Sequence, residues 1–395
     1  NPHPTLARMR EVAPIYHLRH MEFGSYPWLV TRYEDSIRLL NDERFTKDDA
    51  RIPRQGQPSG EKSADDLMME GAAAINRHML TLDPPDHTRL RGLIHKAFTP
   101  NMIRALEARI QEITDGLIDT MIEKGGGDFI QDFAFPLPVT VIAELLGIPR
   151  EDRDKFREWS QAIIMGGTRG ADYEKVGIAA LEFIMYFHEK FDERRAAPKD
   201  DLITALVQAE EAGDKLDPQE LISMVFLLLV AGHETTVNLL GNGILALMQH
   251  PAERSRLSQH PELIRTAIEE LLRYDGPVGV STMRWALEDV EYYGEIIPAG
   301  EMVVASLLSA NRDPEMFANP DGLDITRNPN KHIAFGNGIH YCVGAPLARM
   351  EGAIAINTLL RRVPNLALTV DADTLEWNPT ILLHGMKHMS VTTSG

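Results

Sequence analysis

The stretch Phe335-Gly336-Asn337-Gly338-Ile339-His340-Tyr341-Cys342-Val343-Gly344 contains the only cysteine of the chain. An isolated cysteine most often packs as a small buried hydrophobic residue. In this stretch, however, Gly336, Gly338 and Gly344 have no Cβ, so they can take positive φ and turn main-chain N–H groups toward the sulfur. Such donors, together with the first turn of a helix that Pro346 would open, favour the thiolate form of Cys342. We therefore expect a loop that presents a reactive thiolate.

The composition limits the class of protein. One cysteine among 395 residues excludes an internal disulfide framework and is typical of a reducing cytoplasm, where we expect the protein to be located. The net charge of −18 argues against general binding to nucleic acids or anionic membranes. The longest apolar run, residues 221–232, is shorter than the roughly 20 residues that span a bilayer. We expect no membrane span, no nucleic-acid partner and a monomer.

A long helix is expected in the middle of the chain. Asp217 and Pro218 suit the N-cap and the first helical position, and Glu220 can reach back to form a capping box. Helical character then continues to His250-Pro251, over about 50 Å at ~1.5 Å per residue. The centre of this helix is Ala231-Gly232-His233-Glu234-Thr235-Thr236. The plainest structural interpretation is that the two threonines bond back to carbonyl groups one turn earlier.

Two further motifs also have a structural interpretation. Gly241-Asn242-Gly243-Ile244-Leu245-Ala246 mimics a dinucleotide-binding fingerprint but does not follow a strand, so we expect its glycines to permit close helix packing. Glu270-Leu271-Leu272-Arg273 places an acid and a base on one helical face. That spacing normally gives a weak surface ion pair.

Together, the cysteine stretch, the segment at 231–236 and the acid–base element at 270–273 resemble the motifs of the cytochrome P-450 haem-thiolate monooxygenases, in the order found in soluble bacterial members. The resemblance covers about residues 33 to 384. It implies a mainly α fold with a minor β region, in which a long central helix lies over haem b and the cysteine loop lies on the opposite face. It also implies a single haem-thiolate domain over residues 1–395, with a β-richer N-terminal part at about 1–60 and a helical remainder with short sheets.

The resemblance implies a role for each motif. Cys342 would be the axial ligand of the haem iron, and a thiolate in that position pushes electron density toward the iron and favours cleavage of an O–O bond. Thr235 would steady bound oxygen or its water, and Glu234 would relay protons. Other residues near the haem would be Ala231, Gly232, Phe335, Gly336 and Gly344, with propionate donors at His87, Arg91, Arg284 and His340. A structural lock behind the cysteine loop would be formed by Glu270, Arg273 and Arg327.

The implied reaction inserts one oxygen atom from O₂ into a hydrophobic small molecule, by hydroxylation or epoxidation, and the other atom leaves as water. The substrate would be a fatty acid, terpenoid, steroid or polyketide. Tentative substrate contacts are Phe226, Val230, Val278, Val280 and Leu382, together with the loop at 68–79. No flavin- or nicotinamide-binding motif is visible, so electrons from NAD(P)H would arrive through a separate ferredoxin or flavodoxin and its reductase. The basic residues between 77 and 109 form either a docking patch for such an acidic donor or an ordinary solvated face.

Three alternatives remain open at this point. A peroxide-driven haem-thiolate peroxygenase would need no redox partner, but such relatives usually lack the acid–alcohol pair. A non-catalytic haem sensor or electron carrier would need no proton relay. A cysteine nucleophile that used Cys342 with His340 would need a special loop geometry, because residues two apart rarely meet, and no orienting acid or oxyanion hole is evident.

Overall fold

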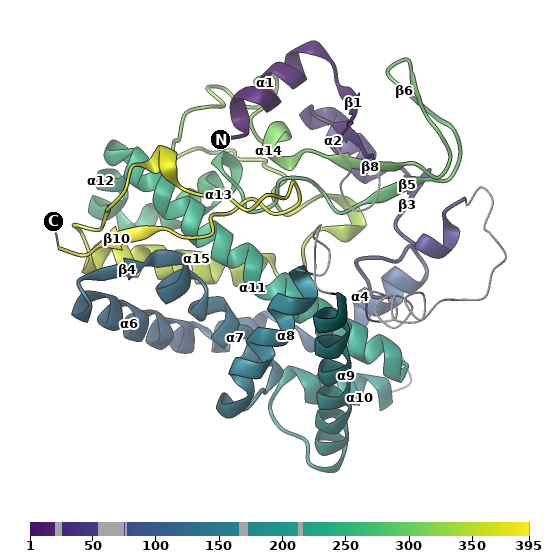
Figure 1. Ribbon diagram of the computed structural model, residues 1–395, viewed down its shortest axis with the longest axis horizontal. Coiled ribbons are helices and arrows are strands. Elements are labelled where there is room, and N and C mark those ends of the chain that lie inside the picture. The colour runs from purple at the N-terminus through teal and green to yellow at the C-terminus, as the bar shows by residue number, and fades with distance from the viewer. Residues whose placement is uncertain (20–25, 54–74, 76, 166–172, 212–215, 395) are drawn as a thin grey trace. The chain divides into compact units, whose positions relative to one another are not determined.

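The computed structural model describes residues 1–19, 26–53, 75, 77–165, 173–211 and 216–394 (Figure 1). Helices predominate, and the strands are short. The chain forms two compact units, each assembled from separate stretches of sequence. The first unit comprises residues 1–45, 104–138 and 234–395, and the second comprises residues 46–103 and 139–233.

The first unit contains the sheets and the C-terminal helices. Its helices are α1 (His3–Val12), α2 (Tyr33–Leu40), α6 (Glu107–Glu123), α12 (Pro251–Gln259), α13 (Ile264–Tyr274), α14 (Leu307–Ala310) and α15 (Ala345–Arg362). Its strands are β1 (Ile15–His17), β2 (Trp28–Val30), β4 (Gly126–Asp128), β5 (Arg284–Ala286), β6 (Val290–Tyr292), β7 (Glu295–Ile297), β8 (Met302–Ala305), β9 (Ala367–Leu368) and β10 (Ser390–Thr392). Four elements cross from one unit to the other: β3 (Phe45–Thr46), α5 (Pro100–Ala105), α7 (Pro136–Leu146) and α11 (Pro218–Gln249).

A five-stranded sheet in the order β1-β2-β8-β5-β3 organises part of the first unit. The central pair, β2 and β8, is parallel and in register from Trp28↔Val303 to Val30↔Ala305. Both strands are rich in apolar residues and buried along their whole length, as expected of strands covered on both faces. A second sheet pairs β10 with β4 and β9, and Figure 1 shows the yellow C-terminal strand beside the blue β4.

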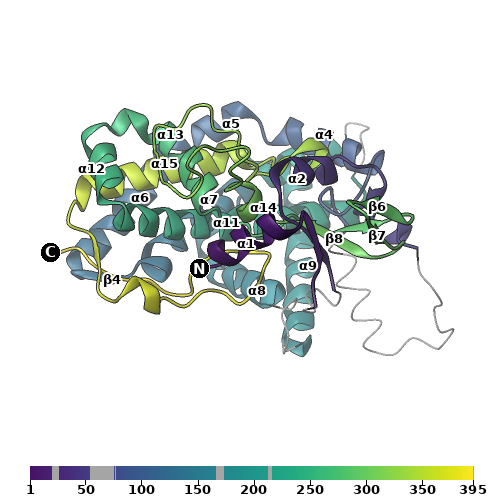
Figure 2. The same cartoon turned by 90° about the horizontal axis from the view of Figure 1, so that it is seen from above.

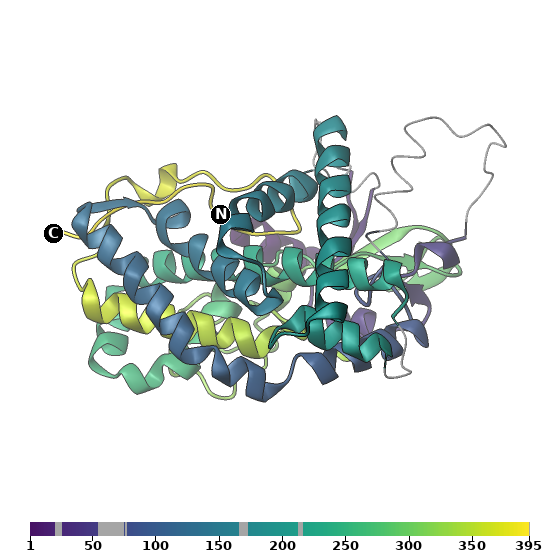
Figure 3. The same cartoon turned by 90° about the horizontal axis from the view of Figure 1, so that it is seen from below.

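Glycines allow the helices of the first unit to pack closely. α15 packs against α13 and α6; Figure 2 shows α13 beside α15, and Figure 3 shows the blue α6 running along the yellow-green α15. A Cβ at Gly352 of α15 would lie 3.1 Å from Ile268 of α13. A Cβ at Gly241 would lie 2.7 Å from Ile130, and one at Gly243 would lie 3.2 Å from Leu271. The expectation that the glycines at 241 and 243 serve helix packing is confirmed.

The second unit is helical. Its complete helices are α4 (Asp86–Ala97), α8 (Arg153–Met165), α9 (Tyr173–Ala196) and α10 (Leu202–Glu211). α9 packs against α8 and α10, and it is the long teal helix that stands upright in Figure 3. Aromatic rings fill the space beside it: the ring centroids of Phe183 and Phe187 are 4.5 Å apart, and Phe226 of α11 meets Phe183 edge to face at 5.7 Å.

The long helix predicted from residue 218 to about 250 is α11, and its N-terminus is the predicted capping box. The Asp217 N–H donates to Glu220 at 2.9 Å, and the Glu220 N–H donates back to Asp217 at 2.8 Å. Within the described residues, α11 is one helix with the length and apolar content of a membrane span. However, 67% of its qualifying window is buried inside the protein, as is usual for the core helix of a globular fold.

A carboxylate shared by two histidines fastens the N-terminal helix to the rest of the first unit. Nε2 of His3 lies 2.7 Å and Nε2 of His384 lies 3.0 Å from the same oxygen of Asp275, directly after α13. Burial alone would raise the pKa of Asp275, but the hydrogen bonds from the two histidines hold it well below its usual range. His384 also stacks on Trp377, with ring centroids 4.4 Å apart.

Candidate functional site

The cysteine lies in a glycine-bracketed loop just before α15. The Cys342 side chain is exposed, and its N–H donates to the carbonyl of Phe335 at 3.0 Å. Gly336 and Gly338 have φ values of +75° and +73°, as predicted. A Cβ at Gly338 would also lie only 2.4 Å from the side-chain oxygen of Asn41, so glycine is required there both for its backbone conformation and for space.

The prediction of positive φ is wrong for Gly344. This residue is the N-cap of α15 and has φ −80°, the ordinary right-handed conformation, because the helix begins at the next residue. A Cβ on Gly344 would lie 3.8 Å from the sulfur of Cys342. The glycine therefore leaves the space beside the sulfur open. Pro346 occupies the first turn of α15, as predicted.

The acid–alcohol pair lies in the middle of α11. Oε2 of Glu234 is buried and has no hydrogen-bond partner among the residues that the structure describes. Burial raises the pKa of Glu234, because the charged form loses hydration. Thr235 follows directly and is half-buried. An acid with a raised pKa beside an alcohol suits proton transfer, because it holds its proton more readily than an exposed carboxyl group does.

The residues that precede this pair divide into two environments. Ala231 is exposed although α11 is buried over residues 221–229, so this small side chain faces open space. Gly232 instead faces α7, because a Cβ there would lie 3.1 Å from Cδ1 of Ile142. Its missing side chain is therefore needed for helix packing, which the sequence did not indicate. His233 is buried and directs Nδ1 at the carbonyl of Leu229 at 2.8 Å, and burial lowers the pKa of its ring.

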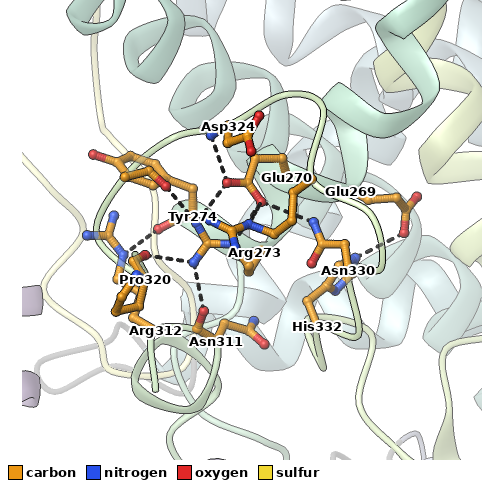
Figure 4. A network of polar contacts seen from close by, with 12 residues as sticks. Glu269, Glu270, Arg273, Tyr274, Asn311, Arg312, Pro320, Asp324, Asn330 and His332 are labelled. Atoms are coloured by element: carbon orange, nitrogen blue, oxygen red, sulfur yellow. Dashed lines mark hydrogen bonds and ion pairs between the residues drawn. The ribbon is translucent and has the colours of Figure 1, made fainter. Parts of the chain in front are cut away.

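Glu270 and Arg273 form a fully buried ion pair rather than a surface pair (Figure 4). Nε and Nη2 of Arg273 donate to the two carboxylate oxygens of Glu270, each at 2.8 Å. Arg327 adds a third charged hydrogen bond to Glu270 at 3.0 Å, Asn330 donates at 3.1 Å and the N–H of Asp324 donates at 2.9 Å. The structure thus brings Glu270, Arg273 and Arg327 together, with every lone-pair direction of the carboxylate in use.

The other donors of Arg273 hold the backbone that leads toward the cysteine loop. Nη1 donates to the carbonyls of Asn311 at 3.0 Å and Pro320 at 2.7 Å, and Nη2 donates to the carbonyl of Gly322 at 2.9 Å. Figure 4 shows Arg273 at the centre of this arrangement, with Asn311 and Pro320 on one side and Glu270 on the other. Asn311 in turn accepts the N–H of Ile333 at 2.8 Å. The network therefore couples α13 to the segment immediately before Phe335.

The four propionate candidates are divided between the two units. His87 is buried and Arg91 is half-buried, one turn apart on α4 of the second unit. Arg284 is buried on β5 of the first unit, where Nη1 donates to the carbonyl of Thr282 at 3.1 Å. His340 ends the single 3₁₀ turn Gly338–His340, two residues before Cys342. His87 and Arg91 thus lie in the second unit, and Arg284 and His340 lie in the first.

Val280 and Leu382 are brought together, whereas Val278 belongs to a different core. Val280 forms a small apolar cluster with Leu29 and Val304, and Leu382 packs against it. The Gly279 N–H donates to the carbonyl of Leu382 at 2.9 Å, which fixes the two segments side by side. Val278 packs instead against the large core around the five-stranded sheet. The substrate contacts of Val278, Val280 and Leu382 stay predictions.

The substrate candidates of the second unit are also unequal. Phe226 is buried with its ring edge against Phe183, so it contributes to the packing of α9 on α11. Val230, one turn later, is half-buried. The predicted substrate loop at 68–79 lies mainly outside the described residues.

Ion pairs within each unit neutralise some of the basic residues between 77 and 109, where a basic patch was expected. Arg77 lies 3.5 Å from Asp86, and Arg109 lies 2.8 Å from Glu112. Arg89 pairs with Glu220 at the start of α11. These partners favour the interpretation of a solvated, internally compensated face over that of an open basic patch.

Sequence reasoning missed four polar residues near the described motifs. Glu269, adjacent to Glu270, pairs with Arg349 of α15 and with His332. Glu351 of α15 is buried and faces the Thr236 hydroxyl, and burial raises the pKa of this acid to about 8. The two adjacent acids at 269–270 and the charged residues at 349 and 351 were visible in the sequence. Which residues they contact was not visible, because those residues lie in distant segments of the chain.

Comparison with known proteins places this geometry in a family. The model for the family described as Cytochrome P450 matches residues 169–383. The chain is 47% identical to the polyketide biosynthesis cytochrome P450 PksS of Bacillus subtilis (strain 168), over 100% of this chain and 96% of that protein. The solved structure of PksS matches with a TM-score of 0.92 at 45% identity, over 100% of this chain and 97% of that chain.

Two other solved structures were found with ligands of one chemical kind. Myxobacterial cytochrome P450 CYP267B1 in complex with myristic acid matches with a TM-score of 0.92 at 46% identity, over 100% of this chain and 97% of that chain. P450BioI in complex with an acyl carrier protein that carries hexadec-9Z-enoic acid matches with a TM-score of 0.88 at 38% identity, over 99% of this chain and 98% of that chain.

Proposed function

Because this chain belongs to the cytochrome P450 family, we propose that it oxidises a fatty acyl or polyketide chain at a haem whose iron is held by Cys342. Family membership makes the chain a haem-dependent monooxygenase that acts on a hydrophobic small molecule. Two statements are proposals: that Cys342 is the iron ligand, and that the substrate is an acyl or polyketide chain.

The residues of this chain fit a haem-thiolate centre. Cys342 is exposed in a loop in which Gly344 keeps the space beside the sulfur open. Arg284 supplies a buried guanidinium in the same unit, suited to one propionate, and His340 supplies a second donor. When bound, haem supplies the redox and oxygen-activating chemistry, and the thiolate strengthens it by electron donation.

The chain's own residues hold and move protons. We assign Glu234 to proton delivery, because its buried carboxyl has a raised pKa and an oxygen that no described residue engages. Thr235 follows it on the helix and supplies the hydroxyl that passes the proton on and orients water. Ala231, exposed shortly after the buried run 221–229, leaves room on that face of α11.

Replacing Thr235 with alanine should uncouple electron consumption from product formation. Without the hydroxyl, protons are delivered without direction, so we expect product per NAD(P)H to fall by at least about tenfold, or about 1.4 kcal/mol in selectivity, with peroxide released instead. The measurement is product, peroxide and NAD(P)H in a reconstituted system. Thr235→Ser is the matched control, because it keeps the hydroxyl and should retain coupling. Unchanged coupling in Thr235→Ala would remove Thr235 from the mechanism.

The observation that carries the substrate assignment is the similarity of this chain to relatives whose ligand or pathway is known. Two relatives in the same fold were solved with a fatty acid or a fatty acyl group, and a third is described as acting in polyketide biosynthesis.

Titration of the ferric protein while the haem Soret band is recorded tests this assignment. The panel contains free fatty acids, acyl groups on an acyl carrier protein, a macrolide, a steroid and a terpenoid. Saturable conversion to the high-spin form by an acyl or polyketide ligand supports the proposal. Conversion by the steroid or terpenoid alone contradicts it. Response to the carrier-bound acyl group, but not to the free acid, would identify the carrier as part of the substrate.

The family depends on redox partners, and we propose that the donor here is a ferredoxin or flavodoxin served by an NAD(P)H-dependent reductase. We also propose a cytoplasmic monomer in which the two compact units form one haem domain. Product formed with a reductase system but not with peroxide alone would exclude the peroxygenase alternative. Consumption of O₂ in the same assay would exclude a non-catalytic sensor.

A further inference from the structure

A cluster formed by Glu269, Arg349 and His332 lies next to the cysteine loop and has no part in the mechanism described above. Nε and Nη2 of Arg349 donate to the two carboxylate oxygens of Glu269 at 2.6 and 2.8 Å. Nε2 of His332 lies 3.0 Å from the same carboxylate, a contact that is drawn in Figure 4. Nδ1 of His332 accepts the N–H of Ala334 at 3.2 Å, so the ring proton is on Nε2 and is donated to Glu269.

The guanidinium of Arg349 contacts the cysteine loop at two places. Its central carbon lies 4.5 Å from the centre of the Phe335 ring, within the range of a cation–π interaction. Its Nη1 donates to the hydroxyl of Tyr341 at 3.3 Å. The carbonyl of Phe335 accepts the N–H of Cys342, and Tyr341 is the residue before Cys342. The positive charge thus lies against both segments that hold the cysteine.

The charges of this pair persist across the working pH range. Burial opposes ionisation of Glu269, but the hydrogen bonds from Arg349 and His332 prevail and lower its pKa to about 2. The hydrogen bond to Glu269 likewise raises the pKa of Arg349. Side-chain exposures of 34% for Arg349 and 27% for Glu269 mean that water and salt reduce the field of each charge without cancelling it.

We propose that Glu269 and Arg349 are positioning residues with opposed charges, which together set the reduction potential of the metal centre held by Cys342 while they fix Phe335 and Tyr341. The inference rests on the proposed function, since it requires Cys342 to be the iron ligand. A nearby positive charge stabilises the more electron-rich, reduced state and raises the potential, and a nearby negative charge lowers it. In the native pair the two effects oppose each other.

Neutralising one partner at a time separates this role from a purely structural one. Glu269→Gln leaves the charge of Arg349 uncompensated, so the ferric/ferrous potential should rise. Arg349→Gln leaves the charge of Glu269, so the potential should fall. The double variant should return toward the wild-type value, and Arg349→Lys, which keeps the positive charge, should stay near it. The potentials are measured by spectroelectrochemical titration at low salt and at about pH 8.5, above the ordinary histidine range.

Arg362→Gln is the matched control, since it removes the same charge from the other end of α15. Arg362 pairs with Asp115 at 2.8 Å and lies about 20 Å along the helix from Arg349, beyond the screening length of about 10 Å at 0.1 M salt. We expect it to leave the potential unchanged.

The outcomes distinguish this inference from the proposed function. Shifts of opposite sign in the two single variants, with the thiolate-type carbon monoxide spectrum retained, support the inference. Shifts of the same sign, no shift, or loss of haem from both variants would overturn it. Each of these results would mean that the pair has a structural role and that its opposed charges do not set the potential. A wild-type protein without a thiolate-type spectrum would instead overturn the proposed ligation by Cys342.

Discussion

Replacing Cys342 with serine should abolish the thiolate-type carbon monoxide spectrum and lower turnover by at least about three orders of magnitude, or about 4 kcal/mol of activation free energy. A hydroxyl is a far poorer electron donor than a thiolate, so the push that favours O–O cleavage is lost. Because Cys342 is exposed in its loop, the change creates no cavity in the core, and the protein should still fold. The measurements are the carbon monoxide difference spectrum, the haem content and the turnover rate.

Ile339→Ala is the control for this prediction. The Ile339 side chain is 50% exposed in the same loop, so its truncation changes the loop without removing a sulfur ligand. We expect the thiolate-type spectrum to survive. If Cys342→Ser kept its haem and the activity of the wild-type protein, a residue other than Cys342 would have to be the iron ligand.

Replacing Arg273 with alanine should reduce the free energy of unfolding by about 3–5 kcal/mol, the cost of leaving a buried charge without its partner. Both Glu270 and Arg273 are completely buried, and Arg273 also holds three carbonyl groups of the segment at 311–322. Since that segment leads to Phe335, haem content should fall together with stability. The measurements are chemical denaturation and the ratio of haem to protein.

Arg109→Ala provides the contrast, because Arg109 forms an exposed pair with Glu112 one turn away. Such pairs contribute about 1 kcal/mol or less. If Arg273→Ala does not yield folded protein, Asn330→Ala removes a single hydrogen bond to Glu270 and should cost about 1–3 kcal/mol. A loss in Arg273→Ala no greater than that in Arg109→Ala would mean that the buried network does not stabilise the fold.

Local patterns in the sequence were sufficient for the helices that frame the site. The capping residues at 217–220 and the apolar run after them predicted α11, and Pro346 marked the first turn of α15. These features depend only on neighbouring residues, so no tertiary contact was needed to recognise them. The spacing of Glu270 and Arg273 was equally visible, but spacing alone indicated a weak surface pair rather than a buried one.

Features that depend on distant segments could not be predicted. Gly232 packs against Ile142 of α7, so a glycine in a functional motif has a packing role. The direction of a missing Cβ depends on helix orientation, which a motif does not encode. The pairing of Glu269 with Arg349 joins residues 80 positions apart. Phe226 packs against Phe183, although the sequence had suggested a contact with substrate. The sequence could not separate these two roles, because an apolar residue suits a protein core and a substrate pocket equally well.

Iron K-edge X-ray absorption of the haem-loaded ferric protein, compared with Cys342→Ser, tests the central claim most directly. Ligation by Cys342 predicts one sulfur atom in the first shell of the wild-type iron, and its replacement by a lighter oxygen or nitrogen scatterer in the variant. A wild-type first shell made only of nitrogen and oxygen, or a sulfur signal that persists without Cys342, would contradict the account.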